Sequence, residues 1–199
     1  MTILAFNKWD CSDISVQDPG LKKYLCVQPV IVPRTGAKYA GNRFHKSRIF
    51  IVERLMNKLM VVGRVGTKKH KVSSDMTTGK AATVYNIVFE AFTIIENKTN
   101  DNPVKVFVQA IENAAAREEI ITIEYGGARY PKPVECAPQR RIDRVLKFMT
   151  QGSYKASFNK KKSAAQALAE EIIAAYNEDQ KSLAISKKLE VERQADSSR

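Results

Sequence analysis

Histidine and cysteine are scarce in this chain of 199 residues, which contains two histidines and three cysteines. Cys11, Cys26 and Cys136 are odd in number, widely separated and without CxxC pairing, so the sequence predicts neither a disulfide framework nor a zinc site. His45 and His70 have no second metal ligand at helical spacing. We therefore expect no metal, no cofactor and a reducing, cytoplasmic setting.

Recognisable catalytic motifs are also missing. Gly79-Lys80 is not part of a Walker motif, because Ser74 stands where the first glycine should be and Ala81 replaces the hydroxyl residue. The acidic pairs Glu118-Glu119 and Glu170-Glu171 point in different directions on a helix or strand, so we interpret them as surface charge. No catalytic residue is predicted, although a Ser-His-Asp or Cys-His-Asp grouping assembled by folding stays open.

Long apolar runs are missing as well. None approaches the ~18 residues of a membrane span. The start, MTILAFNKWD, lacks a basic n-region followed by an apolar h-region, so we expect neither a membrane partner nor a cleaved leader. Apolar residues still make up 44% of the chain, which is enough for a core, and the length fits one domain with extensions.

Acidic residues are outnumbered by basic ones, at 21 against 33, and the formal net charge of +12 is typical of a polyanion binder. Residues 34–58 hold seven basic residues against one acid, and residues 138–162 hold eight against one. Residues 63–80 add five more against Asp75. Each block alone could be a solvated face, but three in one small chain favour a surface that follows phosphates.

The stretch from 119 to 144 predicts a two-stranded arm that leads into a basic helix. The β-branched and aromatic run 120–125 stops at Gly126-Gly127, which can take the positive φ angles of a tight hairpin turn. Pro131 and Pro133 lie two residues apart, so both missing N–H groups fall on one edge of the return strand. The arm should therefore have two strands only, and such a ribbon must pack on helices or become ordered against a partner.

The tip of this arm carries groups that suit a nucleic acid. Arg129, Tyr130 and Lys132 supply two charges and one ring, for phosphate contact and base stacking. A solvent-exposed hairpin in an ordinary α+β domain is the alternative interpretation, since short basic hairpins are common among loops.

Apolar residues at three- and four-residue steps predict helices before the arm, at 48–62 and 79–97. Gly63 should end the first, and Asn102-Pro103 supplies an N-cap and a first-turn proline for a third. The residues expected to face the core are Ile49, Val52, Leu55, Met56, Leu59, Met60, Val84, Ile87, Val88, Ala91, Ile95, Val104, Phe107, Val108 and Ile111.

Further helices are predicted after the arm. Pro138 opens a helix whose apolar face comprises Ile142, Val145, Leu146 and Met149. The basic residues left largely on its other faces are Arg140, Arg141, Arg144 and Lys147. Ser163 and Gln166 form a capping box that opens the next helix. From Asp179 onward apolar positions thin out, which predicts a solvent-facing or partner-bound helix.

Together these segments predict a mainly α fold, with a helical core of about five to six helices, a protruding two-stranded β-hairpin arm and an extended N-terminal segment. We expect a single domain over residues 1–199. Its parts are an N-terminal extension and basic segment at 1–47, core helices at 48–118, the arm at 119–137, and basic and C-terminal helices at 138–199.

The charge and the arm favour an RNA-binding protein, and two other classes stay open. A free RNA-acting enzyme would need a catalytic grouping, which the sequence does not show. A chromatin-type DNA binder would use the same charge, but it should bind duplex DNA and ribosomal RNA equally at matched salt.

Segments along nearly the whole chain resemble a known family in order and spacing. They are Lys8-Trp9-Asp10, 18–24, 51–55, 57–60, Gly79-Lys80, 102–104, 110–114, 117–119, 125–127, 138–141, 155–158, 168–172 and 187–199. On these motifs the chain resembles an archaeal-type member of the universal small-subunit ribosomal protein seven family. It departs from the family at Ala116, where relatives usually carry proline, and in the variable loop 63–79.

The resemblance implies a structural constituent of the small ribosomal subunit that acts in translation. It implies binding to the 3′ major domain of small-subunit rRNA, nucleation of head assembly, and a place at the subunit interface near the decoding centre. Implied partners are that rRNA, exit-site tRNA and mRNA, and neighbouring proteins of the head and platform. Such binding should depend on folded RNA shape and phosphates more than on base sequence.

The basic blocks and the resemblance together assign two sets of residues. Predicted rRNA contacts are Arg34, Lys38, Arg43, Lys46, Arg48, Arg64, Lys68, Lys69, Lys71, Lys80, Arg140, Arg141, Arg144, Lys155, Lys160, Lys161 and Lys162. Predicted to lie near tRNA and mRNA are the hairpin residues Gly126, Gly127, Arg129, Tyr130 and Lys132.

Overall fold

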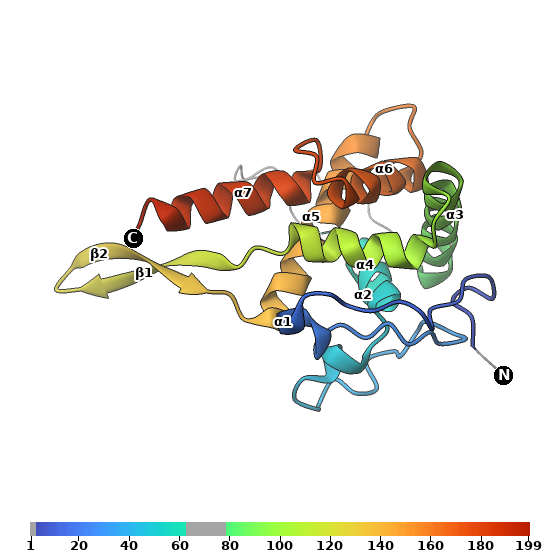
Figure 1. Cartoon of the computed structure of the whole chain (residues 1–199), viewed down its shortest axis with the longest axis horizontal. Helices are drawn as coiled ribbons and strands as arrows, with labels where there is room; N and C mark the ends of the chain where they lie inside the picture. Colours follow the sequence, from blue (N-terminus) through green and yellow to red (C-terminus); the bar gives the residue numbers. More distant parts are fainter. Residues whose placement is uncertain (1–2, 63–78) are drawn as a thin grey trace.

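The computed structural model describes residues 3–62 and 79–199 and shows a mainly helical molecule with a long hairpin arm (Figure 1). Its elements, in chain order, are α1 (Pro19–Lys22), the 3₁₀ turn η1 (His45–Arg48), α2 (Ile51–Met60), α3 (Ala81–Thr99), α4 (Pro103–Ala114), β1 (Glu118–Tyr125), β2 (Ala128–Glu135), α5 (Pro138–Ser157), α6 (Ala164–Tyr176) and α7 (Leu183–Asp196). The segment before α2 is mostly irregular. The predicted fold class is confirmed.

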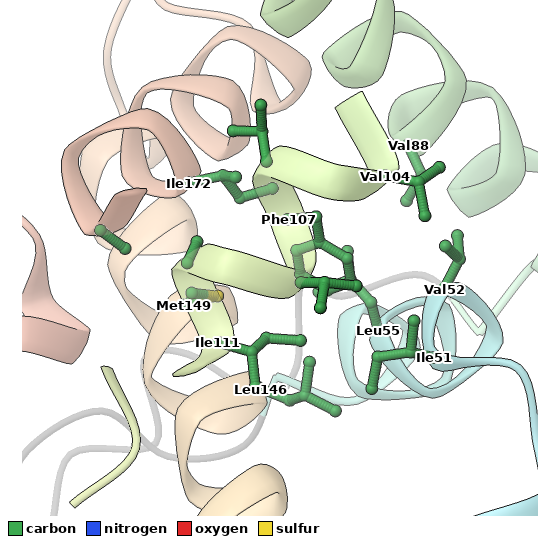
Figure 2. Packing of buried hydrophobic residues seen from close by; sticks show 14 of the residues in the cluster. Ile51, Val52, Leu55, Val88, Val104, Phe107, Ile111, Leu146, Met149 and Ile172 are labelled. Carbon is green, nitrogen blue, oxygen red and sulfur yellow. The ribbon is translucent and has the colours of Figure 1, made fainter. Parts of the chain in front are cut away.

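The core forms where α2 to α6 meet. Figure 2 shows Phe107 of α4 at its centre, with Leu55 of α2 on one side and Met149 of α5 on the other. All three side chains are buried. The predicted apolar face of α5 is buried throughout, and the inward faces predicted for α3 and α4 are buried except at Ile87, which is partly exposed. Helical periodicity therefore located most of the core.

Two predicted helix caps are present. The side chain of Asn102 accepts a hydrogen bond from the backbone N–H of Val104 at 3.0 Å, and Pro103 occupies the first turn of α4. At the start of α6, Ser163 Oγ accepts from the Gln166 N–H at 3.1 Å, and the Gln166 side chain accepts from the Ser163 N–H at 3.4 Å. This reciprocal pair is the predicted capping box.

The first predicted core helix begins later than expected, at Ile51 rather than residue 48. Ile49 and Phe50 are extended, because the backbone N–H of Ile51 donates to the carbonyl of Cys26 at 2.9 Å and Phe50 bridges to Cys26. The prediction that Ile49 faces inward from a helix is therefore wrong. The predicted cap at Gly63 lies outside the described residues.

The N-terminal segment lies on the core and is fastened to it at several points. Trp9 is buried among the rings of Phe6, Phe89 and Phe92, with ring centroids 5.6 to 5.9 Å apart. Further along, a carboxylate oxygen of Glu112 accepts hydrogen bonds from two consecutive backbone N–H groups at residues 17 and 18. The extension thus has a fixed course although it contains little regular structure.

Arg141 joins three parts of the molecule from inside. Its guanidinium contacts Asp18 at 2.9 Å and donates to the backbone carbonyls of Ala115 and Ala116 at 3.4 and 3.1 Å. Asp18 belongs to the N-terminal segment, and the two alanines connect α4 to β1. Since Arg141 is buried, the prediction that it lies away from the packed face of its helix is wrong.

The hairpin pairs β1 and β2 in antiparallel register, with Thr122 opposite Pro131 and Ile120 opposite Pro133. It is a two-stranded sheet within the described residues, as predicted. Figure 1 shows α7 running along the arm toward the C-terminus. There the guanidinium of Arg199 contacts both carboxylate oxygens of Glu118 at 2.6 Å, so the root of the arm leans on a helix and its tip does not.

Glu171 was predicted to be surface charge and is instead buried. Its carboxylate accepts hydrogen bonds from Ser182 Oγ at 2.8 Å and the Ala184 N–H at 3.3 Å, which fixes the start of α7. A Cβ atom on Gly152 of α5 would lie 2.7 Å from this carboxyl group, so only glycine leaves room for it. Burial raises the pKa of Glu171, although these hydrogen bonds oppose the rise.

Replacing Glu171 with Gln should change how stability depends on pH. Because burial makes the folded carboxyl bind its proton more tightly, the stabilising contribution of Glu171 is complete below the ordinary pKa of 4.5 and is lost as the pH rises through the raised value. Gln still offers an acceptor and carries no charge. We expect Glu171→Gln to lose less stability than the unsubstituted chain as the pH rises above 4.5, because its side chain stays uncharged. Urea unfolding measures the difference.

The matched control is Glu170→Gln, because Glu170 is the exposed neighbour and pairs with Lys162 at the surface. This substitution should leave the dependence of folding stability on pH almost unchanged. Parallel profiles for Glu171→Gln and the unsubstituted chain would contradict the assignment of a raised pKa to Glu171.

Replacing Arg141 with Ala should destabilise the fold rather than only remove a charge. The substitution leaves Asp18 and two carbonyls without their donor, at a cost of roughly 2–4 kcal/mol. Arg140→Ala, at the exposed neighbouring position, should cost less than about 1 kcal/mol. Thermal unfolding of both variants tests this, and equal midpoints for the two would refute it.

Candidate nucleic-acid interface

Segment 34–48 forms a basic surface that contains no acidic residue. Glu53 of α2 lies next to it, but one of its carboxylate oxygens already accepts hydrogen bonds from the Thr35 N–H and Oγ at 2.7 and 2.6 Å. The exposed cations of the segment, which form no ion pair with another described residue, are Arg34, Lys38, Arg43 and Arg48. Four predicted contact residues are therefore available to a ligand here.

Lys46 belongs to the same segment but is engaged within the protein. It contacts Asp143 of α5 at 2.8 Å, and the buried Arg54 of α2 contacts the other oxygen of Asp143 at 3.1 Å. Burial alone would raise the pKa of Asp143, but the bond from Lys46 and the charge of Arg54 outweigh it and hold that pKa below its usual value. Asp143 thereby fastens the basic segment to α5.

The first turns of α5 hold basic residues whose surroundings differ. Arg140 and Arg144 lie one turn apart and both contact Glu119 at the root of β1, at 2.6 and 2.7 Å. Arg140 keeps 54% of its side chain exposed. Arg141, between them in the sequence, is buried and bonded to groups inside the fold. Of these three predicted contacts, two thus remain accessible and are partly neutralised.

The second half of α5, from Lys147 onward, and the loop after it form a second exposed basic surface. Lys162 pairs with Glu170, and the ring of Phe158 stacks on that of Tyr154 at 5.5 Å. The exposed lysines without an ion pair in the described part of the chain are Lys147, Lys155, Lys160 and Lys161. Figure 1 shows α5 spanning the distance between this surface and segment 34–48.

Five predicted contacts come from the third basic block. Arg64, Lys68, Lys69 and Lys71 lie outside the described residues, so their assignment stays a prediction. Lys80 is exposed and immediately precedes α3.

The hairpin tip has the predicted turn geometry. Gly126 and Gly127 have φ angles of 59° and 82°, which favour glycine. Tyr130 and Lys132 are exposed, and Arg129 lies 3.5 Å from Glu124 across the strands. The tip thus presents two exposed rings, Tyr125 and Tyr130, and a lysine that forms no ion pair with another described residue.

Two exposed rings were not identified from the sequence. Tyr39 and Phe44 both lie in segment 34–48, and each follows a basic residue directly, as Lys38-Tyr39 and Arg43-Phe44. This repeated basic–aromatic pair was the available signal.

Residues 3–62 and 79–199 contain no group of three or more His, Cys, Asp or Glu side chains that could hold a metal ion. No helix in these ranges has the length and apolar character needed to cross a bilayer.

Comparison with known proteins identifies the family. The model of the family described as ribosomal protein S7p/S5e matches residues 21–199. The small ribosomal subunit protein uS7 of Nanoarchaeum equitans is 50% identical over 199 residues, which is the full length of both chains. The uS7 proteins of Methanosphaera stadtmanae and Archaeoglobus fulgidus are 46% and 45% identical, over 98% and 99% of this chain and 98% and 95% of their own lengths.

These matches confirm the archaeal type of the resemblance and exclude the enzyme alternative, since the family is structural. The chain belongs to the ribosomal protein S7p/S5e family and is a structural constituent of the small ribosomal subunit.

Proposed function

We propose that the chain is a primary rRNA-binding protein that attaches to the 3′ major domain of small-subunit rRNA. The observation that carries this proposal is the set of exposed cations without carboxylate partners at the two ends of α5. Phosphates contribute most of the affinity in such complexes, and an unpaired cation can contact them without first breaking an internal ion pair. Segment 34–48 and the surface around Lys160 and Lys161 are the main contact areas.

The arrangement suits early binding during assembly of the subunit head. The N-terminal segment, α5 and the root of the arm are fastened together by Asp143, Arg141 and Glu119 in the protein alone. A surface that is ordered before binding loses less conformational entropy when the RNA arrives. The chain acts as one domain in this role, with neighbouring head and platform proteins joining later.

The hairpin tip serves a different partner. It extends past the helices (Figure 1), carries the exposed Tyr125, Tyr130 and Lys132, and lies away from both basic surfaces of α5. We assign it to exit-site tRNA and mRNA at the subunit interface, near the decoding centre. Rings and a lysine on a narrow ribbon suit contact with a nucleic acid whose bases are partly unstacked.

Binding of the full chain to the isolated 3′ major domain tests the proposal, with equal-length duplex DNA and an unrelated structured RNA as competitors across a salt titration. Tight binding selective for the rRNA supports it. Equal and steeply salt-dependent binding to all three would instead indicate a generic polyanion binder, which is how a chromatin-type DNA binder would behave.

Removing two lysines from the loop after α5 should weaken rRNA binding. We expect Lys160→Ala with Lys161→Ala to lower the slope of log affinity against log salt by about two, because two phosphate contacts are lost. The control is Lys98→Ala with Lys105→Ala, which removes two exposed lysines of α3 and α4 outside the basic blocks. Equal slopes for the two double variants would exclude the loop from the interface.

Deleting residues 126–131 should separate rRNA binding from contact with exit-site tRNA. The remaining strands keep the root contacts of Glu118 and Glu119, so we expect rRNA affinity and incorporation into the head to stay within about twofold. Exit-site tRNA binding to subunits reconstituted with the variant should decline. Loss of rRNA binding in this deletion would show that the tip belongs to the rRNA interface.

A further inference from the structure

Tyr39 and Phe44 are exposed although their rings are large and apolar. The exposed fractions are 48% for Tyr39 and 56% for Phe44, and neither side chain belongs to the hydrophobic core. A single exposed ring needs no explanation. Two rings within six positions of a segment that is otherwise polar and basic form a feature that packing does not account for.

Each ring lies beside the cation that precedes it in the chain. The Lys38 ammonium lies 5.9 Å from the centre of the Tyr39 ring, and the Arg43 guanidinium lies 5.0 Å from the centre of the Phe44 ring. These distances are typical of cation–π contacts. A cation on one side of a ring, with half of the ring exposed, is the combination that single-stranded nucleic acid binders use for a base and its phosphate.

The backbone at Phe44 supports a role for its ring. Phe44 has a φ of 59° and a ψ of 20°, in the left-handed region, which bulky residues rarely adopt. Strained residues of this kind persist where the surrounding structure holds them, and they cluster at binding sites. Glycine or asparagine would suit this backbone better, so the presence of an exposed aromatic residue here requires another reason.

Tyr39 also lines a cavity of about 530 Å³ in the described part of the chain. Arg34, Lys46 and Lys58 also line this cavity, and Asp143 is the acidic residue among its lining residues. That carboxylate is already engaged by Lys46 and Arg54. The lining of the cavity therefore combines an aromatic ring with several cations, and its acid is already paired with cations of the protein.

We propose that Tyr39 and Phe44 are stacking platforms for unpaired nucleotides of the rRNA. This inference rests on the proposed function and specifies the ligand of segment 34–48. The base stacks on the exposed part of the ring, and the adjacent cation contacts the phosphate. The segment then distinguishes bulged or looped nucleotides from a continuous helix, whose bases are stacked on one another and whose phosphates alone are accessible.

The test measures binding of the full chain and of Tyr39→Leu and Phe44→Leu to the isolated 3′ major domain across a salt titration. Leucine keeps an apolar side chain and removes the stacking surface. We expect each substitution to weaken binding roughly tenfold with an unchanged salt slope, because stacking releases no counterions. Thermal unfolding should stay unchanged, since both rings are exposed.

Two control variants complete the design. Tyr125→Leu removes a ring from the hairpin tip that is more exposed than Tyr39 and Phe44, at 81%, and should leave rRNA affinity unchanged. Arg34→Ala with Arg48→Ala removes cations of the same segment and should lower the salt slope by about two.

The outcomes separate this inference from the proposed function. Unchanged affinity in both leucine variants, together with a reduced slope in the arginine variant, overturns the stacking role and leaves rRNA binding by the segment intact. A reduced slope in the leucine variants shows that the rings only hold their cations in place, which also overturns it. Unchanged behaviour in all the segment variants would remove segment 34–48 from the interface altogether.

Discussion

The buried guanidinium of Arg141 is the constraint on which the rest of the structure depends. A buried charge without partners is strongly unfavourable, so the fold must bring acceptors to it. Asp18 and the carbonyls of residues 115 and 116 meet this need, and they come from the N-terminal segment and from the link between α4 and β1. Satisfying one side chain therefore places the extension and the arm relative to α5.

Net charge alone does not show which cations are free to bind a ligand, because some of them are paired inside the fold. The net charge of +12 counts every lysine and arginine equally. In the fold, Asp143 and Glu119 each hold two cations, and these contacts fasten the basic segment and the arm to α5. The cations that no carboxylate of the described chain contacts include Arg34, Lys38, Arg43 and Arg48 in segment 34–48 and Lys155, Lys160 and Lys161 at and after the end of α5.

Local features could be predicted from the sequence, and long-range ones could not. The caps of α4 and α6, the glycine turn and the apolar face of α5 depend on residues a few positions apart, and each was predicted correctly. Arg141 and its partner Asp18 are 123 positions apart, and no periodicity links them. Glu171 was misinterpreted for the same reason, because Gly152 and Ser182 create its buried site from two other segments.

The hairpin arm is held at its root by charged residues, some of which are also proposed to contact RNA. Among the described residues, the ion pairs between its strands and the helices lie near the root, where Glu118 contacts Arg199 and Glu119 contacts Arg140 and Arg144. Five charged groups at the root of the ribbon thus help to set the direction of its tip. Since Arg140 and Arg144 are also exposed to the proposed RNA ligand, a phosphate that competes with Glu119 for them would act on the root of the arm. Two of the charges that hold the hairpin in place are therefore also cations that the proposed rRNA contact would use.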